Sequence, residues 1–129
     1  MTAPTRSSIP ILASVSVAPG GSKAVPVAAG VGTWIDVRGQ NGGQLAYSVK
    51  NGSSAPGVQG QFTFQVGDGS DTSTVTNITD LWTGGGDTVA NSENTGLIEL
   101  PATASFVRML AYGNTTNNVT FRGTLFAKA

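Results

Sequence analysis

Two acidic residues inside predicted strands, Asp36 and Glu99, are the candidates for acid–base chemistry in this chain. Paired carboxylates can hydrolyse glycosidic bonds, but nothing in the sequence places these two side chains together. Ion pairs with Arg38, Arg108 or Arg122 are the simpler role for them. The chain has no His and no Cys, so it lacks the commonest general base, the commonest transition-metal ligand and any thiol nucleophile. The sequence therefore predicts a protein that is not an enzyme.

A second acidic segment, Asp68-Gly-Ser-Asp71, resembles part of a calcium-binding loop. Carboxylates two or three positions apart around a glycine can converge on a hard cation. The segment lacks the alternating third ligand and the distal glutamate of such a loop. A hairpin turn explains the same residues, because Asp, Gly and Ser are residues that turns prefer. We therefore predict no metal and no cofactor, with calcium at Asp68 and Asp71 kept as the alternative.

Aromatic side chains offer a third chemistry, because a sugar ring can stack on them. Trp34 lies on the more polar face of its predicted strand. Trp82 immediately precedes the Gly-rich stretch 83–96, which is predicted to be a long exposed loop of the kind that carries binding function. In a β-sandwich of this size, aromatic residues more commonly anchor the core or an interface. Carbohydrate binding is therefore an alternative, and the sequence leaves open whether the loop binds a glycan. The residues considered for the platform are Trp34, Tyr47, Trp82 and Tyr112.

Alternation of apolar and polar residues predicts the strands that must position these side chains. The clearest strand places Phe62, Phe64 and Val66 on one face. In residues 72–81 the apolar residues fall on opposite faces, which predicts a bulge or a break near Asn77. The other predicted strands before the last quarter of the chain cover residues 11–17, 22–28, 33–38, 44–50 and 97–100.

The last quarter of the chain predicts a long antiparallel hairpin. Residues 105–112 and 119–126 are rich in β-forming residues and flank six turn-forming residues. In the second run Val119, Phe121 and Leu125 point to one side. The first run carries apolar residues on both faces, which indicates a strand covered on both sides. We expect this hairpin to form the middle of a β-sandwich that the rest of the chain completes.

The fold class that follows is all-β. No stretch has a helical apolar repeat, and eight or nine short strands with Gly-rich turns are typical of an antiparallel β-sandwich or a barrel. Eight strands in two sheets favour a jelly roll, and an immunoglobulin-like arrangement comes second because the Cys-Trp-Cys pattern is absent. The 129 residues suit one domain. Residues 11–129 are predicted to form the sandwich, and residues 1–10, with two prolines, an extended N-terminal arm.

Composition narrows the classes of function. The formal net charge is zero, 11% of the residues are charged, and the seven Lys and Arg form no cluster, which argues against a nucleic-acid partner. No apolar run is long enough for a membrane-spanning helix. The run 9–18 is interrupted by Pro10, Ser14 and Ser16, which argues against a secretory signal. A polar surface with so few charges suits a protein that is packed against others.

These features together resemble a family. They are a small Cys-free and His-free β-sandwich, a Pro-containing arm, a Thr/Asn/Gly-rich surface, and the closing run Phe106-Val-Arg … Gly113-Asn-Thr … Val119-Thr-Phe. The chain resembles, in style rather than through one diagnostic motif, the small virion structural proteins of tailed bacteriophages, in particular capsid decoration (cement) proteins. The resemblance implies a non-enzymatic virion protein, assembled in the host cytoplasm. It implies a homo-oligomer, with a trimer favoured, that braces neighbouring major capsid subunits.

Under this resemblance, residues 1–10 correspond to an arm that reaches a neighbouring subunit, and no catalytic residue is carried over. One alternative is a phage tail or fibre component, or a carbohydrate-binding β-sandwich module. Another is a bacterial surface or pilus-like subunit, which requires an export signal that the sequence does not show. The predicted interface residues are Pro4, Arg6, Ile9, Trp34, Trp82, Arg108 and Arg122.

Overall fold

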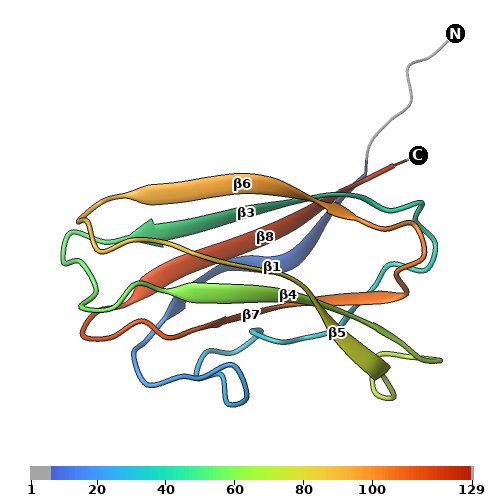
Figure 1. Ribbon diagram of the computed structural model, residues 1–129, viewed down its shortest axis with the longest axis horizontal. Helices are drawn as coiled ribbons and strands as arrows, with labels where there is room; N and C mark the ends of the chain where they lie inside the picture. The colour runs from blue at the N-terminus through green and yellow to red at the C-terminus, as the bar shows by residue number, and fades with distance from the viewer. Residues whose placement is uncertain (1–6, 129) are drawn as a thin grey trace, which may run out of the picture.

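The computed structural model describes residues 7–128, and these residues form two four-stranded antiparallel sheets packed face to face (Figure 1). The all-β prediction and the β-sandwich prediction are confirmed. No helix that could cross a membrane occurs in the described part of the chain. Sheet A has the order β1-β8-β3-β6, and its strands are β1 (Ser7–Val17), β8 (Val119–Ala127), β3 (Gly43–Asn51) and β6 (Glu93–Leu100). Sheet B has the order β2-β7-β4-β5, and its strands are β2 (Ile35–Asp36), β7 (Phe106–Tyr112), β4 (Gln61–Asp68) and β5 (Thr76–Gly85).

The strand pairs are nested along the chain. The first strand pairs with the last, β2 with β7, β3 with β6, and β4 with β5. Two further pairings, β3 with β8 and β4 with β7, join these pairs into the two sheets. The chain therefore doubles back once, at the β4–β5 hairpin, and the resulting double ribbon winds around the core.

The predicted closing hairpin is wrong, because β7 and β8 lie in different sheets. β7 pairs with β2 and β4, and β8 pairs with β1 and β3. The connection between them crosses from one sheet to the other, and Asn114, which is 2% exposed, holds it by donating from Nδ2 to the Val17 and Asn117 carbonyls at 2.9 Å. Each of the two strands nevertheless occupies an inner position in its own sheet.

The first strand begins earlier than the sequence predicted. Residues 7–10 already pair with β8, for example Ile9 with Leu125, so they belong to the sheet and not to an arm. Pro10 is compatible with this place because β1 is an edge strand, where a missing N–H can face outward. Residues 1–6, and with them Pro4 and Arg6, lie outside the described residues.

The predicted strand 22–28 is wrong, and the predicted strand 33–38 is reduced to the two residues of β2. Residues 18–34 instead form an irregular excursion. Pro26 removes a backbone donor, and Gly30 and Gly32 have φ of 85° and 81°, a region that interrupts a strand and that glycine adopts readily. In Figure 1 this excursion, blue to cyan, runs below β7.

The stretch 83–96 is not a long loop. β5 continues to Gly85 and β6 begins at Glu93, which leaves a connection of residues 86–92. The Asp87 carboxylate holds this connection by accepting hydrogen bonds from Ser92 Oγ at 2.6 Å and from Asn94 Nδ2 at 2.9 Å. These two bonds, first that from Ser92, hold the pKa of Asp87 below its usual value. The composition of residues 83–96 predicted a loop wrongly, because glycines and small polar residues are also compatible with edge strands.

The irregularity predicted near Asn77 is confirmed. The register between β4 and β5 shifts between Val66, opposite Thr79, and Asp68, opposite Thr76. Asn77 lies in this stretch with φ of 52°, a left-handed conformation that asparagine tolerates better than most residues. The extra residue of β5 is therefore a β-bulge on an edge strand.

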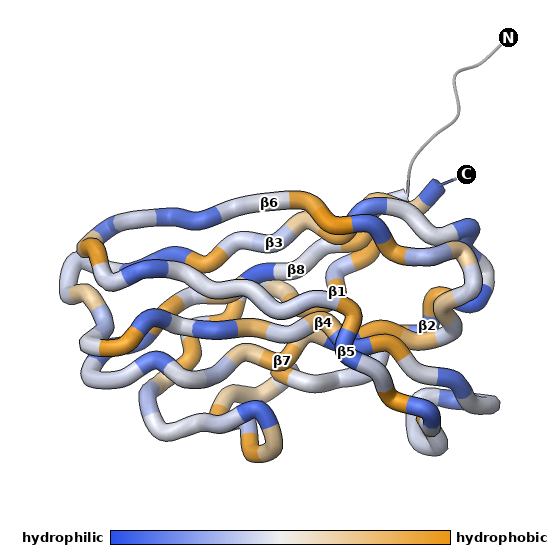
Figure 2. Tube along the Cα trace, in the orientation of Figure 1, coloured by the Kyte–Doolittle hydropathy of each residue, from blue (hydrophilic) through white to orange (hydrophobic). Residues whose placement is uncertain are grey.

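The core lies between the sheets and follows the alternation read from the sequence. In β8, Val119, Phe121 and Leu125 are all at most 1% exposed, and in β4, Phe62 and Phe64 are fully buried. Figure 2 shows apolar segments in the strands of both sheets. The remaining large, fully buried side chains are Val17, Val37, Leu45, Val49, Leu100, Phe106, Val107 and Met109.

Glycines make room for the largest inward side chain of sheet A. Tyr47 lies directly between Gly96 of β6 and Gly123 of β8. A Cβ atom on Gly123 would lie 2.7 Å from Met109 Sδ and 3.1 Å from an edge carbon of Phe64, closer than side chains tolerate without moving. The two sheets therefore pack closely at Gly123, with no room for a side chain there.

We expect Gly123→Ala to destabilise the fold by about 1–3 kcal/mol, because overpacking forces neighbouring core side chains off their preferred rotamers. Urea unfolding followed by tryptophan fluorescence measures the change. Gly52→Ala is the matched control, since a Cβ there meets nothing within 4 Å. Equal unfolding midpoints for the two variants would contradict the close packing at Gly123.

Candidate functional site

The two sheets differ in how their outer faces are covered. The excursion of residues 18–34 covers the outer face of sheet B. Gly32 N donates to the Met109 carbonyl at 3.0 Å, and the centroid of the Trp34 ring lies 4.3 Å from the Arg108 guanidinium carbon. This explains why β7 has apolar residues on both faces. Met109 faces the core, while Leu110, on the opposite side, is 4% exposed beneath the excursion.

A chain of polar contacts ties the excursion to sheet B. Lys23 forms an ion pair with Asp80, Asp80 Oδ1 accepts from Gln65 Nε2 at 2.8 Å, and Gln65 Oε1 accepts from Arg108 Nε at 2.9 Å. Burial lowers the pKa of Arg108, and the hydrogen bonds from Lys23 and then Gln65 lower the pKa of Asp80. Because each of these groups has a partner within the chain, the network stabilises the fold and is not a binding site.

Asp36 and Glu99 do not form an acid pair. Asp36 lies in β2 of sheet B and Glu99 in β6 of sheet A. Asp36 is engaged by Arg38, which donates from Nη2 to Oδ2 at 2.6 Å and from Nε to Oδ1 at 3.0 Å. The ion pair expected for Asp36 is therefore confirmed with Arg38, and the arrangement of paired carboxylates needed for glycoside hydrolysis is not present at these two residues.

We expect Asp36 to titrate far below its usual range. The side-chain hydrogen bond from Arg38, followed by that from the Arg38 backbone, lowers the pKa of Asp36 from 3.8 to about 2. Because the folded-state pKa is lowered, the stabilising effect is present above pH 3.8 and is lost as the pH falls through about 2. NMR titration of the Asp36 carboxyl carbon measures this, and Arg38→Gln should return the midpoint towards 3.8. The Asp87 midpoint is the internal control, and an unchanged Asp36 midpoint in the variant would contradict the assignment.

The four aromatic residues considered for sugar stacking do not form one platform. Tyr47 and Trp82 stack with their ring centroids 5.3 Å apart, and both pack against Phe62. Trp34 lies on the outer face of sheet B under Arg108, and the Tyr112 hydroxyl bonds to Thr63 Oγ1 at 2.9 Å. Trp82, 38% exposed, therefore remains the one of these rings that combines a stacked partner with an exposed surface.

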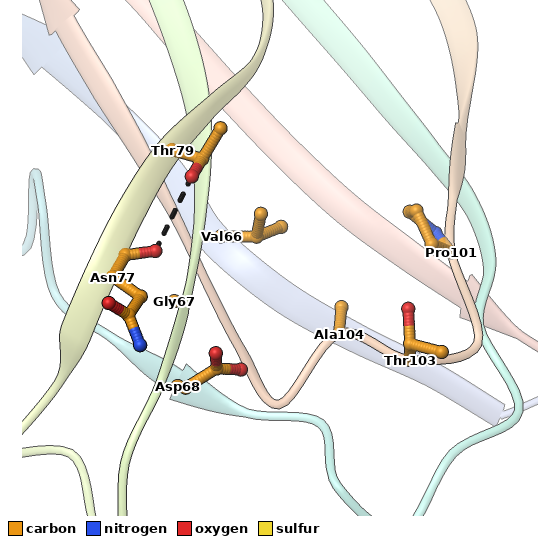
Figure 3. A pocket seen from close by; sticks show the side chains of 8 residues that line it. All are labelled: Val66, Gly67, Asp68, Asn77, Thr79, Pro101, Thr103 and Ala104. Carbon is orange, nitrogen blue, oxygen red and sulfur yellow. Dashed lines mark hydrogen bonds between the residues drawn. The ribbon is translucent and has the colours of Figure 1, made fainter.

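The segment 68–71 does not gather ligands for a cation in the described structure. Asp71 Oδ1 accepts from Ser73 N at 2.9 Å and from Ser73 Oγ at 2.6 Å, which is the hydrogen bonding of a turn. No group of three His, Cys, Asp or Glu side chains that could hold a metal occurs within residues 7–128. Asp68 instead lines a shallow pocket of about 180 Å³ with residues from β5 and from the connection after β6 (Figure 3).

That pocket contains few groups that could react with or bind a ligand. Figure 3 shows Asp68 and Asn77 on one side and Pro101, Thr103 and Ala104 on the other. The one hydrogen bond drawn there joins Thr79 Oγ1 to the Asn77 carbonyl at 3.4 Å. A single carboxylate among small side chains offers neither a nucleophile with its base nor a set of cation ligands.

The outer face of sheet A is left uncovered. It consists of the outward-facing residues of four strands, which we call the open face, and most of its side chains are small and polar. Two large apolar side chains, Leu97 and Phe126, are 60% and 36% exposed on it. The register of sheet A places the following residues on it: Gln44, Ala46, Ser48 and Lys50 of β3; Thr120, Arg122, Thr124 and Phe126 of β8; and Glu93, Thr95, Leu97 and Glu99 of β6. Ser8, Pro10, Ser14 and Ser16 of β1 complete it.

The open face carries a shallow depression at each end. One, of about 250 Å³, is lined by Ser14, Ser48, Lys50, Glu93, Thr120 and Arg122. The other, of about 170 Å³, is lined by Gly43, Gln44, Glu99, Phe126 and Lys128. None of the charged side chains in either depression makes an ion pair with another described residue. The open face therefore presents, in both depressions, charged groups without an ion-pair partner in the described chain, and it is the candidate functional site.

The structure distributes the predicted interface residues that it describes over four places. Arg122 lies on the open face, while Trp34 and Arg108 are used in covering sheet B. Ile9 packs against the core opposite Leu125. Trp82 lies on the edge strand β5. The prediction missed Ser48 and Lys50, although the alternation in residues 44–50 already placed both on the polar side of their strand.

The fold and the open face define the chain as an antiparallel β-sandwich protein with one covered and one bare sheet. Comparison with known protein families, with curated proteins and with solved structures found no match.

Proposed function

We propose that this chain is a non-enzymatic structural protein of a virion, a decoration or cement protein that binds a phage head and stabilises its lattice through the open face. The single observation that carries the proposal is the difference between the two outer faces. The chain uses residues 18–34 to cover sheet B and leaves sheet A bare, with unpaired charges and the exposed side chains Leu97 and Phe126.

The chemistry of the described residues supports a role in assembly. The three pockets described above hold about 170–250 Å³ each, which is below the volume of most small-molecule sites. Exposed apolar side chains among polar groups, as on the open face, are found in many protein interfaces. An enzyme needs a site where reactive groups converge on a substrate. The open face instead presents hydroxyl and charged groups in two separate shallow depressions.

The nested strand pairing supports the jelly-roll interpretation of the sandwich. A jelly roll is a double ribbon of eight strands wound into two sheets. The orders β1-β8-β3-β6 and β2-β7-β4-β5 are those that winding such a ribbon produces. Jelly rolls are common in viral capsid proteins, and this agreement is one of fold only.

The proposed partner is the major capsid protein, with further contacts between copies of this chain in a trimer. Residues 7–10 are part of β1, so the predicted arm does not include them. Apolar contacts at such an interface are screened little by salt, so we expect the self-association to persist at molar salt.

Immuno-electron microscopy of phage particles purified from the source material tests the proposal, with an antibody raised against the recombinant chain. Label over the heads supports it. Label over tails or fibres, or no label on any particle, contradicts it. Light scattering on the purified chain, with and without chelator, provides the companion measurement: we expect a trimer that is insensitive to chelator, and a monomer would count against the lattice role.

A carbohydrate-binding tail or fibre module is the second candidate, favoured by the exposed Trp82 stacked on Tyr47. A glycan array separates the two functions. Binding that is lost in Trp82→Ala, in a variant that retains its folded NMR spectrum, would support the second candidate. The absence of any bound glycan would leave the decoration role as the better explanation of the open face.

A further inference from the structure

The depression around Ser48 holds positive charge that the chain itself does not neutralise. All of the seven Lys and Arg except Arg6 lie in the described part of the chain. Lys23 pairs with Asp80, Arg38 pairs with Asp36, and Arg108 bonds to Gln65 over the Trp34 ring. The cations without a side-chain partner among residues 7–128 are Lys50, Arg122 and Lys128, and the first two line the same depression.

The strand register explains why these two cations converge. Ser48 lies opposite Arg122, and Lys50 lies opposite Thr120, on the neighbouring strands β3 and β8. Lys50 and Arg122 are therefore diagonal neighbours on one face, at about 7–8 Å between their backbones. Like charges at this spacing repel each other, and an anion bound between them would relieve the repulsion.

Three hydroxyl groups line the depression. Ser48 is 6% exposed, and its hydroxyl makes no hydrogen bond with another described residue. Ser14 and Thr120 add two more hydroxyls at the rim. Hydroxyl donors next to an arginine are suited to the two oxygens of a carboxylate, which arginine can bind with two parallel hydrogen bonds.

The net charge and the size select the kind of anion. Lys50 and Arg122 contribute two positive charges, and Glu93, directly opposite Lys50, contributes one negative charge without forming an ion pair. The net charge of one matches a carboxylate better than a phosphate dianion. The volume of about 250 Å³ suits the end of a side chain and not a whole small-molecule ligand.

We propose that this depression is a binding site for a single carboxylate group, presented by an acidic side chain of the protein on which the open face docks. The identity of that partner as a capsid protein depends on the proposed function, but the carboxylate site itself does not. Arg122 binds the carboxylate in the plane of its guanidinium group. Lys50 supplies the second charge, and the Ser48 hydroxyl donates from below.

NMR titration of the ¹⁵N-labelled full chain tests the site with two matched probes, the peptides acetyl-Gly-Glu-Gly-amide and acetyl-Gly-Gln-Gly-amide. We expect saturable shifts at Ser48, Lys50, Thr120 and Arg122 with the glutamate peptide and none with the glutamine peptide. Equal shifts with both peptides would overturn the proposal, as would shifts centred on Lys128. Tighter binding of inorganic phosphate than of the glutamate peptide would overturn the choice of carboxylate.

Three variants sharpen the test. Arg122→Gln should weaken binding of the glutamate peptide by about tenfold or more, because it removes a bidentate, charged donor. Glu93→Gln should tighten binding of the glutamate peptide by about threefold, because it removes an exposed negative charge that repels the carboxylate. Lys128→Gln, at the other end of the open face, should leave it unchanged. If Arg122→Gln binds as well as the unchanged protein while keeping its folded spectrum, the proposal is wrong.

The outcomes for the site and for the proposed function are distinguishable. Peptide binding is measured on the isolated chain, whereas the decoration role is measured on particles. If the chain binds the glutamate peptide but the antibody labels no phage head, the carboxylate site is supported and the proposed function is contradicted. If the antibody labels phage heads but the chain does not distinguish the glutamate peptide from the glutamine peptide, the proposed function is supported and the carboxylate site is contradicted.

Discussion

Replacing Phe64 with alanine should destabilise the protein by about 3–5 kcal/mol, the usual cost of removing a buried phenylalanine from a core. Phe64 is fully buried on β4, packs edge-on against Phe62 at 5.5 Å, and faces Gly123 of the other sheet. The backbone glycine cannot move in to fill the space, because its strand is held by β1 and β3 on both sides. Urea unfolding measures the loss, which is a large part of the total stability of a domain of this size.

Phe126→Ala is the matched control for this prediction. It removes the same side chain from β8, but on the open face, where Phe126 is 36% exposed. We expect a change of about 1 kcal/mol or less. Comparable destabilisation by both variants would mean that the open face is as buried as the core, and would contradict the description of sheet A as a bare surface.

The second large effect concerns Arg108, for which we expect Arg108→Ala to destabilise the protein by about 2–4 kcal/mol. The substitution leaves the Oε1 of Gln65, a residue 8% exposed, without its donor, at a cost of about 1–3 kcal/mol. It also removes the cation above the Trp34 ring, worth about 0.5–2 kcal/mol. The same unfolding experiment applies, and Trp34 fluorescence should change even before unfolding.

Arg122→Ala provides the comparison, because both arginines were predicted to be interface residues on the same footing. Arg122 contacts no described side chain through a hydrogen bond or ion pair, so its loss should alter stability by about 0.5 kcal/mol or less. If Arg108→Ala changed the free energy of unfolding as little as Arg122→Ala, the polar network would not be what holds the excursion on sheet B. The two arginines thus separate a residue that maintains the fold from one that is available to a partner.

Much of the local structure was predictable because strand alternation is a local property. The inward positions of Phe62 and Phe64, the inward row of β8 and the irregularity near Asn77 all follow from which residues are apolar at a spacing of two. The ends of elements were less predictable. β1 extends to Ser7 through Pro10, and β5 extends through Gly84 to Gly85. Both are edge strands, where proline and glycine are tolerated better than in central strands.

The candidate site was only partly predictable. Arg122 was among the predicted interface residues, but Lys50 was not, and no pattern in the sequence joins them. They meet because β3 and β8 are neighbours in sheet A, although about seventy positions separate them in the chain. The aromatic platform failed for the same reason: Tyr47 and Trp82 are brought together, while Trp34 and Tyr112 are directed to the other side of sheet B.

The sequence by itself determined that the protein is all-β, which residues of most strands face inward, and that no His- or Cys-based chemistry is available to it. Only the tertiary structure decided which strands pair, and therefore that β7 and β8 belong to different sheets. It also decided that residues 18–34 cover sheet B and leave sheet A bare. The physical reason is that a strand offers identical backbone donors and acceptors to any neighbour. The choice among neighbours depends on how whole faces of side chains pack together across the sandwich.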